Sequence, residues 1–161
     1  MPRAAAPRIP ADYGVPQDGS GGERRPWNLA DEHLAASRNY WICTTRPDGR
    51  PHAMPVWGLW LDGAVWFSTG PTSQKARNLA RNPAVVVHLE SGDDVVVLEG
   101  EAMRMTDPAA LEPFARAYAE KYGHQVDPSD ETTPVFVVRP RSAYTWTEAD
   151  YPLTATRWIF E

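Results

Sequence analysis

Short strand-forming runs separated by turn signals constrain the fold of this chain more than any other feature. Turn sequences such as Pro47-Asp48-Gly49 and Asp62-Gly63 lie between runs that are rich in β-branched and aromatic residues. These runs cover residues 40–46, 50–61, 64–69, 84–90, 95–105, 134–140, 143–147 and 154–160. Hairpin signals at such spacing favour about six or seven mostly antiparallel strands in a mainly β barrel or Greek-key sheet. The alternation of helix and strand that is typical of doubly wound folds is missing.

Three short helices are expected between these strands. Asn28 can cap a first helix that ends near residue 38. A second helix is expected over residues 73–81 and a third over about 107–122, where Gly123 provides the stop.

Residues 1–26 differ from the rest of the chain in composition. They contain five of the sixteen prolines and four of the eleven glycines. Because such a segment buries little apolar surface, we expect a flexible N-terminal arm that the fold does not need, followed by one domain over residues 27–161. The alternative is an arm that packs on a partner subunit.

Composition argues against several classes of protein. The net charge is −5, so the chain shows no basic footprint for nucleic acid, and no apolar run approaches the roughly 20 residues of a membrane span. The single cysteine, Cys43, rules out an internal disulfide, and the N-terminus lacks the apolar core of a secretory signal. We therefore expect a cytoplasmic protein with no nucleic-acid or membrane partner.

Local catalytic motifs are missing from the sequence. It has no glycine-rich nucleotide loop, no nucleophile elbow and no CxxC or HExxH metal motif. The four histidines are scattered, and Cys43 suits a core position better than a nucleophile's role. We assign no metal site and no catalytic residue, so a bound cofactor is the better candidate for any chemistry.

Lys75, one of two lysines in the chain, follows a loop that is rich in hydroxyl groups. Ser68, Thr69 and Ser73 lie in this loop, just before or at the expected start of the second helix. Free N–H groups at a helix start, hydroxyl groups and a flexible ammonium group together suit a phosphate. A solvated amphipathic helix is the alternative interpretation.

The run at 50–61 could hold a planar ring beside that phosphate. Pro51 and Pro55 cannot donate hydrogen bonds to a sheet, which predicts a bulge or an edge, and Gly58 permits close approach of another group. Tryptophans at positions 57, 60 and 66 supply flat aromatic area. For most of these tryptophans, ordinary core packing is the alternative.

Three spaced segments carry a resemblance to a known family: PDGRPHAMPV at 47–56, STGPTSQKARNLARNP at 68–83 and VVLEGEA at 96–102. Together they resemble the pyridoxamine 5′-phosphate oxidase-like flavin-binding split barrels, and most closely their actinobacterial flavin/deazaflavin oxidoreductase branch. The resemblance covers residues 27–105 well and 154–160 more loosely. It implies a six-stranded antiparallel split β-barrel of Greek-key, FMN-binding type with a few short helices, a homodimer, and cofactor sites at the dimer interface.

The resemblance also indicates cofactor-binding residues. With Ser73 from the loop, the set is Pro55, Val56, Trp57 and Gly58 beside the ring and Ser68, Thr69, Ser73, Gln74 and Lys75 around the phosphate. Many relatives carry arginine where this chain has Gln74, so one phosphate cation is missing. The chain also ends without the arginine-rich stretch that holds the substrate in pyridoxamine phosphate oxidases, so vitamin B6 oxidation is not expected.

These features predict an oxidoreductase that transfers a hydride between coenzyme F420 and a small organic substrate, with FMN as the alternative cofactor. Arg77 and Arg81 could meet the anionic oligoglutamate tail of F420, which favours the deazaflavin. Two other functions remain open. One is a non-catalytic protein that binds, stores or senses a flavin or deazaflavin, and the other is a haem-handling split barrel with His52 and His88 as axial ligands.

Overall fold

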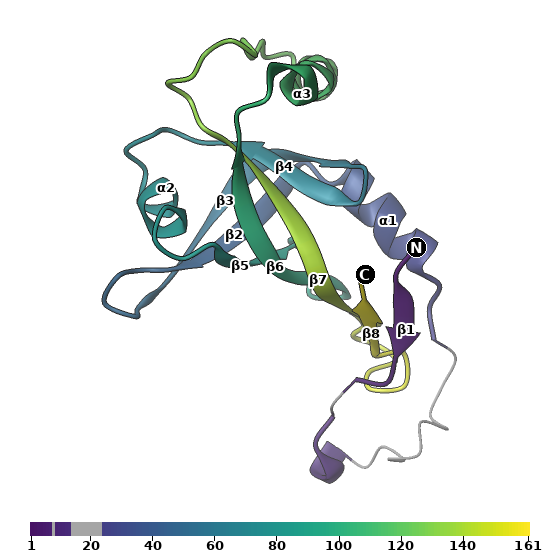
Figure 1. The fold of residues 1–161 in the computed structure, drawn as a ribbon. Helices are drawn as coiled ribbons and strands as arrows, with labels where there is room; N and C mark the ends of the chain where they lie inside the picture. The colour runs from purple at the N-terminus through teal and green to yellow at the C-terminus, as the bar shows by residue number, and fades with distance from the viewer. Residues whose placement is uncertain (8, 14–23) are drawn as a thin grey trace.

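A computed structural model describes residues 1–7, 9–13 and 24–161 of the chain, and it contains a closed antiparallel β-barrel (Figure 1). The strands are β1 (Arg3–Ala5), β2 (Asn39–Thr45), β3 (Pro51–Leu61), β4 (Ala64–Ser68), β5 (Ala84–His88), β6 (Asp94–Met105), β7 (Val135–Thr147) and β8 (Thr156–Ile159). The helices are η1 (Ala11–Tyr13), α1 (Trp27–Ala36), α2 (Gln74–Leu79) and α3 (Pro108–Tyr122).

The barrel has six strands, as the family resemblance implies. Neighbouring strands follow the order β7-β4-β3-β2-β5-β6, and β6 closes the barrel by pairing with β7. Every one of these pairings is antiparallel. Outside the barrel, β8 pairs with β7 and β1 pairs with β8.

The proline-containing strand β3 has one open edge, which confirms the prediction of an edge. It pairs with β2 over residues 51–57 and with β4 only over residues 58–61. Among the described strands, residues 51–57 therefore have a partner on one side only. Pro51 and Pro55 fall in this stretch, where a missing N–H group costs the sheet least.

The β6–β7 ladder corrects the prediction of two separate strands at 134–140 and 143–147. β7 is continuous, and its register against β6 shifts between Glu99 and Gly100, where Arg141 is the extra residue. Gly100 is required at this bulge because a Cβ atom there would lie 2.2 Å from the carbonyl oxygen of Arg139.

Two apolar clusters hold the fold together. The larger one fills the barrel and includes the fully buried side chains of Tyr40, Ile42 and Val87. The smaller one packs α3 against β3, β4 and β7, and Phe114 is its most buried aromatic side chain. The second cluster fixes the end of α3 above the middle of β3, near the open edge.

The helix ends confirm two of the three predicted signals. Asp107 caps α3 by accepting the Ala109 N–H, and Gly123 ends the helix with a φ of 68°, which favours glycine. Asn28, predicted as the cap of α1, lies inside that helix instead. The helix starts earlier because Trp27 is buried against Trp158 and Phe160.

Part of the N-terminal arm is ordered against the domain. Arg3, Ala4 and Ala5 pair with Ile159, Trp158 and Arg157 of β8, respectively. The composition of residues 1–26 did not predict this strand. Residues 8 and 14–23 lie outside the described residues, and the boundary between residues 26 and 27 stays a prediction. In the described part of the chain, no helix has the length and apolar character needed to span a membrane.

Candidate functional site

The hydroxyl groups predicted around Lys75 form a connected cluster. Lys75 Nζ donates to Thr69 Oγ1 at 3.3 Å, and Thr69 Oγ1 lies 3.1 Å from Ser73 Oγ. Ser73 caps α2 by accepting the Ala76 N–H at 3.2 Å. Sequence proximity explains this result, since the turn at Gly70 brings residues only a few positions apart together.

Lys75 carries a charge that no carboxylate in the described part of the chain neutralises. Its ammonium group is partly buried, and among the described residues no carboxylate forms an ion pair with it. Burial lowers the pKa of Lys75 from its ordinary value. A partly desolvated cation that has one long hydrogen bond to a neutral hydroxyl group is suited to an anionic ligand.

Gln74 does not point at the hydroxyl cluster as a cation would. Its amide donates to Asn78 Oδ1 at 2.7 Å and accepts from Arg77 Nη2 at 3.2 Å. Arg77 also donates to the carbonyl oxygen of Thr72 at 2.7 Å. These bonds place the Arg77 guanidinium over the loop that precedes α2. Arg77 is thus a second cation, besides Lys75, beside this turn.

Asn78 ties α2 to the barrel. It is completely buried, and its Nδ2 donates to Thr44 Oγ1 at 2.9 Å. Thr44 Oγ1 in turn lies 3.4 Å from Nδ1 of His52 on β3. This anchoring function is not visible in the sequence, because it appears only once β2 is brought against α2.

The strand end at Ser68 meets the open edge of β3. Gly58 pairs with Phe67 at the end of the β3–β4 ladder, so Ser68 and Thr69 lie beyond that ladder, while Ser68 still pairs with Val135 of β7. Pro55, Val56 and Trp57 directly precede Gly58 on the open edge of β3. Pro55 and Trp57 are exposed and Val56 is half-buried.

Gly58 lies between the barrel core and α3. Its N–H donates to the hydroxyl oxygen of Tyr122 at 3.0 Å, and its carbonyl oxygen lies 2.6 Å from the same oxygen. A Cβ atom at Gly58 would lie 3.0 Å from both the Trp66 carbonyl oxygen and the Tyr40 ring. Its small size thus serves core packing, and its backbone groups are engaged by α3.

Trp57 belongs to an aromatic stack that the sequence analysis did not identify. Its ring stacks on Tyr122 with centroids 4.8 Å apart and planes 7° apart. The Arg38 guanidinium lies 5.0 Å from the Trp57 ring centroid and 5.6 Å from that of Tyr122. No local signal could have linked Trp57 with Tyr122, because only the packing of α3 brings the two together.

The two histidines considered as haem ligands lie on different faces of the sheet. His52 pairs with Thr44 and His88 pairs with Trp41, three residues apart on β2. Because side chains alternate along a strand, positions 41 and 44 face opposite sides. The ring of His88 also stacks on Trp41 at 5.9 Å. Among the described residues, no group of histidine, cysteine or acidic side chains could hold a metal ion.

A cavity of about 610 Å³ borders Ser68. It lies between α3 and the loop at residues 124–134, and Tyr118 and His124 line it together with Arg104. Burial raises the pKa of Tyr118, with a further contribution from Tyr122. The cavity is large enough for a small organic molecule.

Comparisons with known proteins agree with this architecture. The family model described as "Pyridoxamine 5′-phosphate oxidase" matches residues 29–147. No curated protein matches the chain.

Several solved structures share the fold. A conserved hypothetical protein, Rv2991, from Mycobacterium tuberculosis is 29% identical, with a TM-score of 0.66 over 80% of this chain and 88% of that chain. An F420 reductase is 24% identical, with a TM-score of 0.57 over 70% of this chain and 94% of that chain. A haem-binding protein from Mycobacterium smegmatis is 21% identical, with a TM-score of 0.65 over 85% of this chain and 59% of that chain.

Proposed function

Since the chain belongs to the pyridoxamine 5′-phosphate oxidase family, we propose that it is an oxidoreductase that transfers a hydride between coenzyme F420 and a small organic substrate. FMN is the alternative cofactor. The proposal rests above all on Lys75, a partly buried cation without a carboxylate partner among the described residues, set beside the hydroxyl groups of Thr69 and Ser73. The similarity to an F420 reductase supports the choice of cofactor class.

The protein's part in this function is to bind and orient the cofactor. Lys75, Thr69 and Ser68 would hold its phosphate group at the opening between β3 and β4. Pro55, Val56 and Trp57 would line the ring, because the open edge of β3 begins where Ser68 leaves the ladder. The bound ring supplies the hydride chemistry, which the side chains described around it do not provide.

Arg77 favours coenzyme F420 over FMN. Its guanidinium is exposed and is held by Gln74 and by the Thr72 carbonyl oxygen beside the candidate phosphate site. Arg81, also exposed, lies one helical turn further on. A cofactor with a long anionic tail can use both cations, whereas the compact FMN phosphate would need little beyond Lys75.

We further propose that two copies of the chain form a homodimer, located in the cytoplasm, with each copy completing the other's site. Met54 and Trp57 on β3 are 49% and 38% exposed, which is unusual for large apolar side chains next to an open strand edge. A second copy would cover them. Light scattering at micromolar concentration should give twice the mass of the chain, and a monomer would contradict both the dimer and the shared site.

Cofactor binding by the Lys75→Met variant tests the assignment of the phosphate site. Loss of a charged hydrogen bond is worth about 1.5–3 kcal/mol, so the dissociation constant should rise by about 10- to 100-fold for either cofactor. Arg139→Met, which removes an exposed cation from β7, should leave binding unchanged. Fluorescence titration with F420 and with FMN at the same salt concentration measures both. Equal binding by wild type and Lys75→Met would refute the site.

Turnover separates an enzyme from a cofactor-storage or cofactor-sensing protein. Reduced F420 should be oxidised by the wild-type protein when quinones, enones or tetrapyrroles are offered as acceptors. Tight cofactor binding without turnover on any acceptor would favour the non-catalytic alternative. FMN binding at least about tenfold tighter than that of F420, or about 1.4 kcal/mol, would reverse the choice of cofactor.

A further inference from the structure

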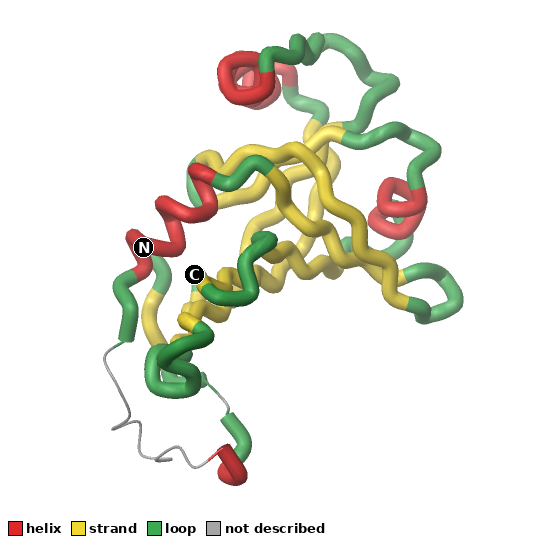
Figure 2. Tube along the Cα trace, turned by 180° about the vertical axis from the view of Figure 1, so that it is seen from behind, coloured by secondary structure: helices red, strands yellow, loops and turns green. Residues whose placement is uncertain are grey.

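A second cavity, of about 760 Å³, lies between the N-terminal segment and the β7–β8 pair. Figures 1 and 2 show β1 and β8 on the side of the barrel away from α2, so this cavity is separate from the Lys75 site. Its walls consist of Pro7, Ile9 and Tyr13 from the N-terminal segment and Tyr144, Trp146, Glu148, Tyr151, Ala155, Thr156 and Arg157 from the C-terminal part of the chain.

Aromatic side chains form much of the wall. Tyr151 meets Tyr13 edge to face, with ring centroids 5.9 Å apart, and contacts Trp146 with centroids 5.8 Å apart. Tyr144 lies on the same face of β7 as Trp146, two residues away. Flat, partly exposed rings of this kind suit a planar ligand that can stack against them.

Arg157 gives the cavity a positive group with an unused donor. Its Nε atom is buried and, among the described residues, has no hydrogen-bond acceptor, and no carboxylate in this part of the chain forms an ion pair with its guanidinium. Glu148 lines the same cavity but is not within ion-pair distance. A buried donor without an acceptor is costly, and a planar guanidinium binds an oxyanion through two parallel hydrogen bonds.

We propose that this cavity binds a planar aromatic anion, with the oxyanion on Arg157 and the ring against Tyr151 and Trp146. The volume lies within the range of cavities that hold small organic ligands. The chain has a net charge of −5, so Arg157 does not belong to a generally basic surface. An arginine in an aromatic cavity of an acidic protein can therefore select for an anionic ligand at this place.

The N-terminal segment completes this site. Pairing of β1 with β8 brings Ala5 opposite Arg157, which holds Pro7, Ile9 and Tyr13 against the cavity. The pairing of Arg3–Ala5 with β8 would therefore serve ligand binding. The composition of the N-terminal arm had predicted a segment that the fold does not need. Loss of these wall residues should open the cavity on one side.

A matched pair of fluorescent probes tests the proposal. The sulfonate 1-anilinonaphthalene-8-sulfonate and its neutral analogue N-phenyl-1-naphthylamine differ only in the anionic group. The wild-type protein should bind the sulfonate with one-to-one stoichiometry and more tightly than the neutral probe. Arg157→Gln should weaken sulfonate binding by about tenfold or more, the loss of one charged contact, and should leave binding of the neutral probe within about twofold.

Two controls locate the binding. Arg139→Gln removes an exposed arginine from β7 and should change neither probe, and Lys75→Met should change neither probe if the two sites are distinct. Absence of one-to-one sulfonate binding, equal loss of both probes in Arg157→Gln, or loss of the sulfonate in Lys75→Met would each overturn the proposal.

A second variant covers the case in which Arg157→Gln fails to fold, as judged by circular dichroism. Tyr13 is 56% exposed and outside both core clusters, so Tyr13→Ala should fold. It should weaken both probes to a similar extent because it removes part of the aromatic wall. Unchanged binding of both probes by Tyr13→Ala would overturn the proposal.

Discussion

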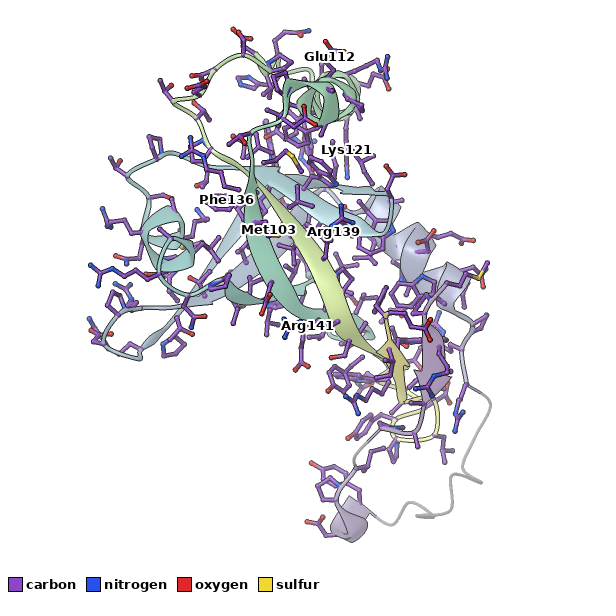
Figure 3. All side chains as sticks on the ribbon, viewed as in Figure 1. Met103, Glu112, Lys121, Phe136, Arg139 and Arg141 are labelled. Carbon is purple, nitrogen blue, oxygen red and sulfur yellow. The ribbon has the colours of Figure 1, made fainter. Side chains whose placement is uncertain are left out.

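The two lysines of this chain lie on different helices, Lys75 on α2 and Lys121 on α3, and they are used differently. Lys121, near the end of α3, lies 3.3 Å from the Ala35 carbonyl oxygen, 2.5 Å from that of Ser37 and 3.2 Å from that of Gly58. Figure 3 shows Lys121 between α3 and the barrel, whereas Glu112 lies on the outer side of the helix. Within the described residues, Lys75 donates one hydrogen bond, to the Thr69 hydroxyl group.

This difference separates a structural cation from one that is free for a ligand. Burial lowers the pKa of both lysines, so desolvation alone does not tell them apart. What distinguishes them is the use of the three ammonium donors, which backbone carbonyl groups occupy at Lys121 and which remain largely open at Lys75. Lys121 fastens α3 to the junction of α1 and β2 and to Gly58.

The largest effect expected from this comparison is on stability. Lys121→Met should lower the free energy of unfolding by about 2 kcal/mol, because three carbonyl groups lose a charged donor and water replaces it only in part. Lys75→Met should change it by no more than about 0.5 kcal/mol. Urea denaturation of both variants measures this difference. If both variants lost the same free energy of unfolding, the two lysines would not differ in their structural role.

The next effect concerns Tyr122, which shares the Gly58 carbonyl group with Lys121. Tyr122→Phe keeps the stack on Trp57 but removes the hydroxyl group that accepts the Gly58 N–H, so stability should fall by about 1 kcal/mol. Tyr118→Phe is the matched control, since its hydroxyl makes no hydrogen bond within the described residues. If Tyr118→Phe lowers the free energy of unfolding as much as Tyr122→Phe does, the hydrogen bonds between Tyr122 and Gly58 contribute nothing to stability.

A smaller effect should appear in the pH dependence of stability. The pKa of Lys75 is lower in the folded state than in the unfolded state, where it is about 10.5. At alkaline pH the unfolded chain therefore binds more protons than the folded chain. As a result, the contribution of Lys75 to stability rises as the pH increases toward about 10.5. The stability of wild type relative to Lys75→Met should therefore increase as pH rises toward that value. Urea titrations at several pH values measure it, and a falling difference would mean that Lys75 is paired.

The smallest expected change is in the titration of His52. Burial lowers the pKa of His52, and the charges of Arg46 and Lys75 lower it further. Lys75→Met should move this pKa up toward its ordinary value, whereas Lys121→Met should leave it in place. NMR titration of the His52 ring signals reports the shift. No movement in Lys75→Met would show that the ammonium group lies away from β3 in solution.

Local signals determined most of the fold. Strand runs, the Asp62-Gly63 turn and the Asp107 and Gly123 helix ends each act over a few residues, so sequence alone predicts them. Asn28 failed as a cap because burial of Trp27 outweighed the capping preference. The break expected between 140 and 143 failed because a bulge absorbed Arg141 within one continuous strand.

The hydroxyl cluster at Lys75 could be predicted for the same reason, since Thr69, Ser73 and Lys75 lie within one turn and the start of one helix. Contacts between distant residues could not. The bond from Gly58 to Tyr122 spans 64 positions, and that from Asn78 to Thr44 spans 34. Only the packing of α2 and α3 on the barrel decided which lysine would bond to backbone carbonyl groups and which would keep its ammonium donors available for a ligand. Hydrogen-bond partners that are far apart in the chain are set by such packing, so they leave no local pattern in the sequence.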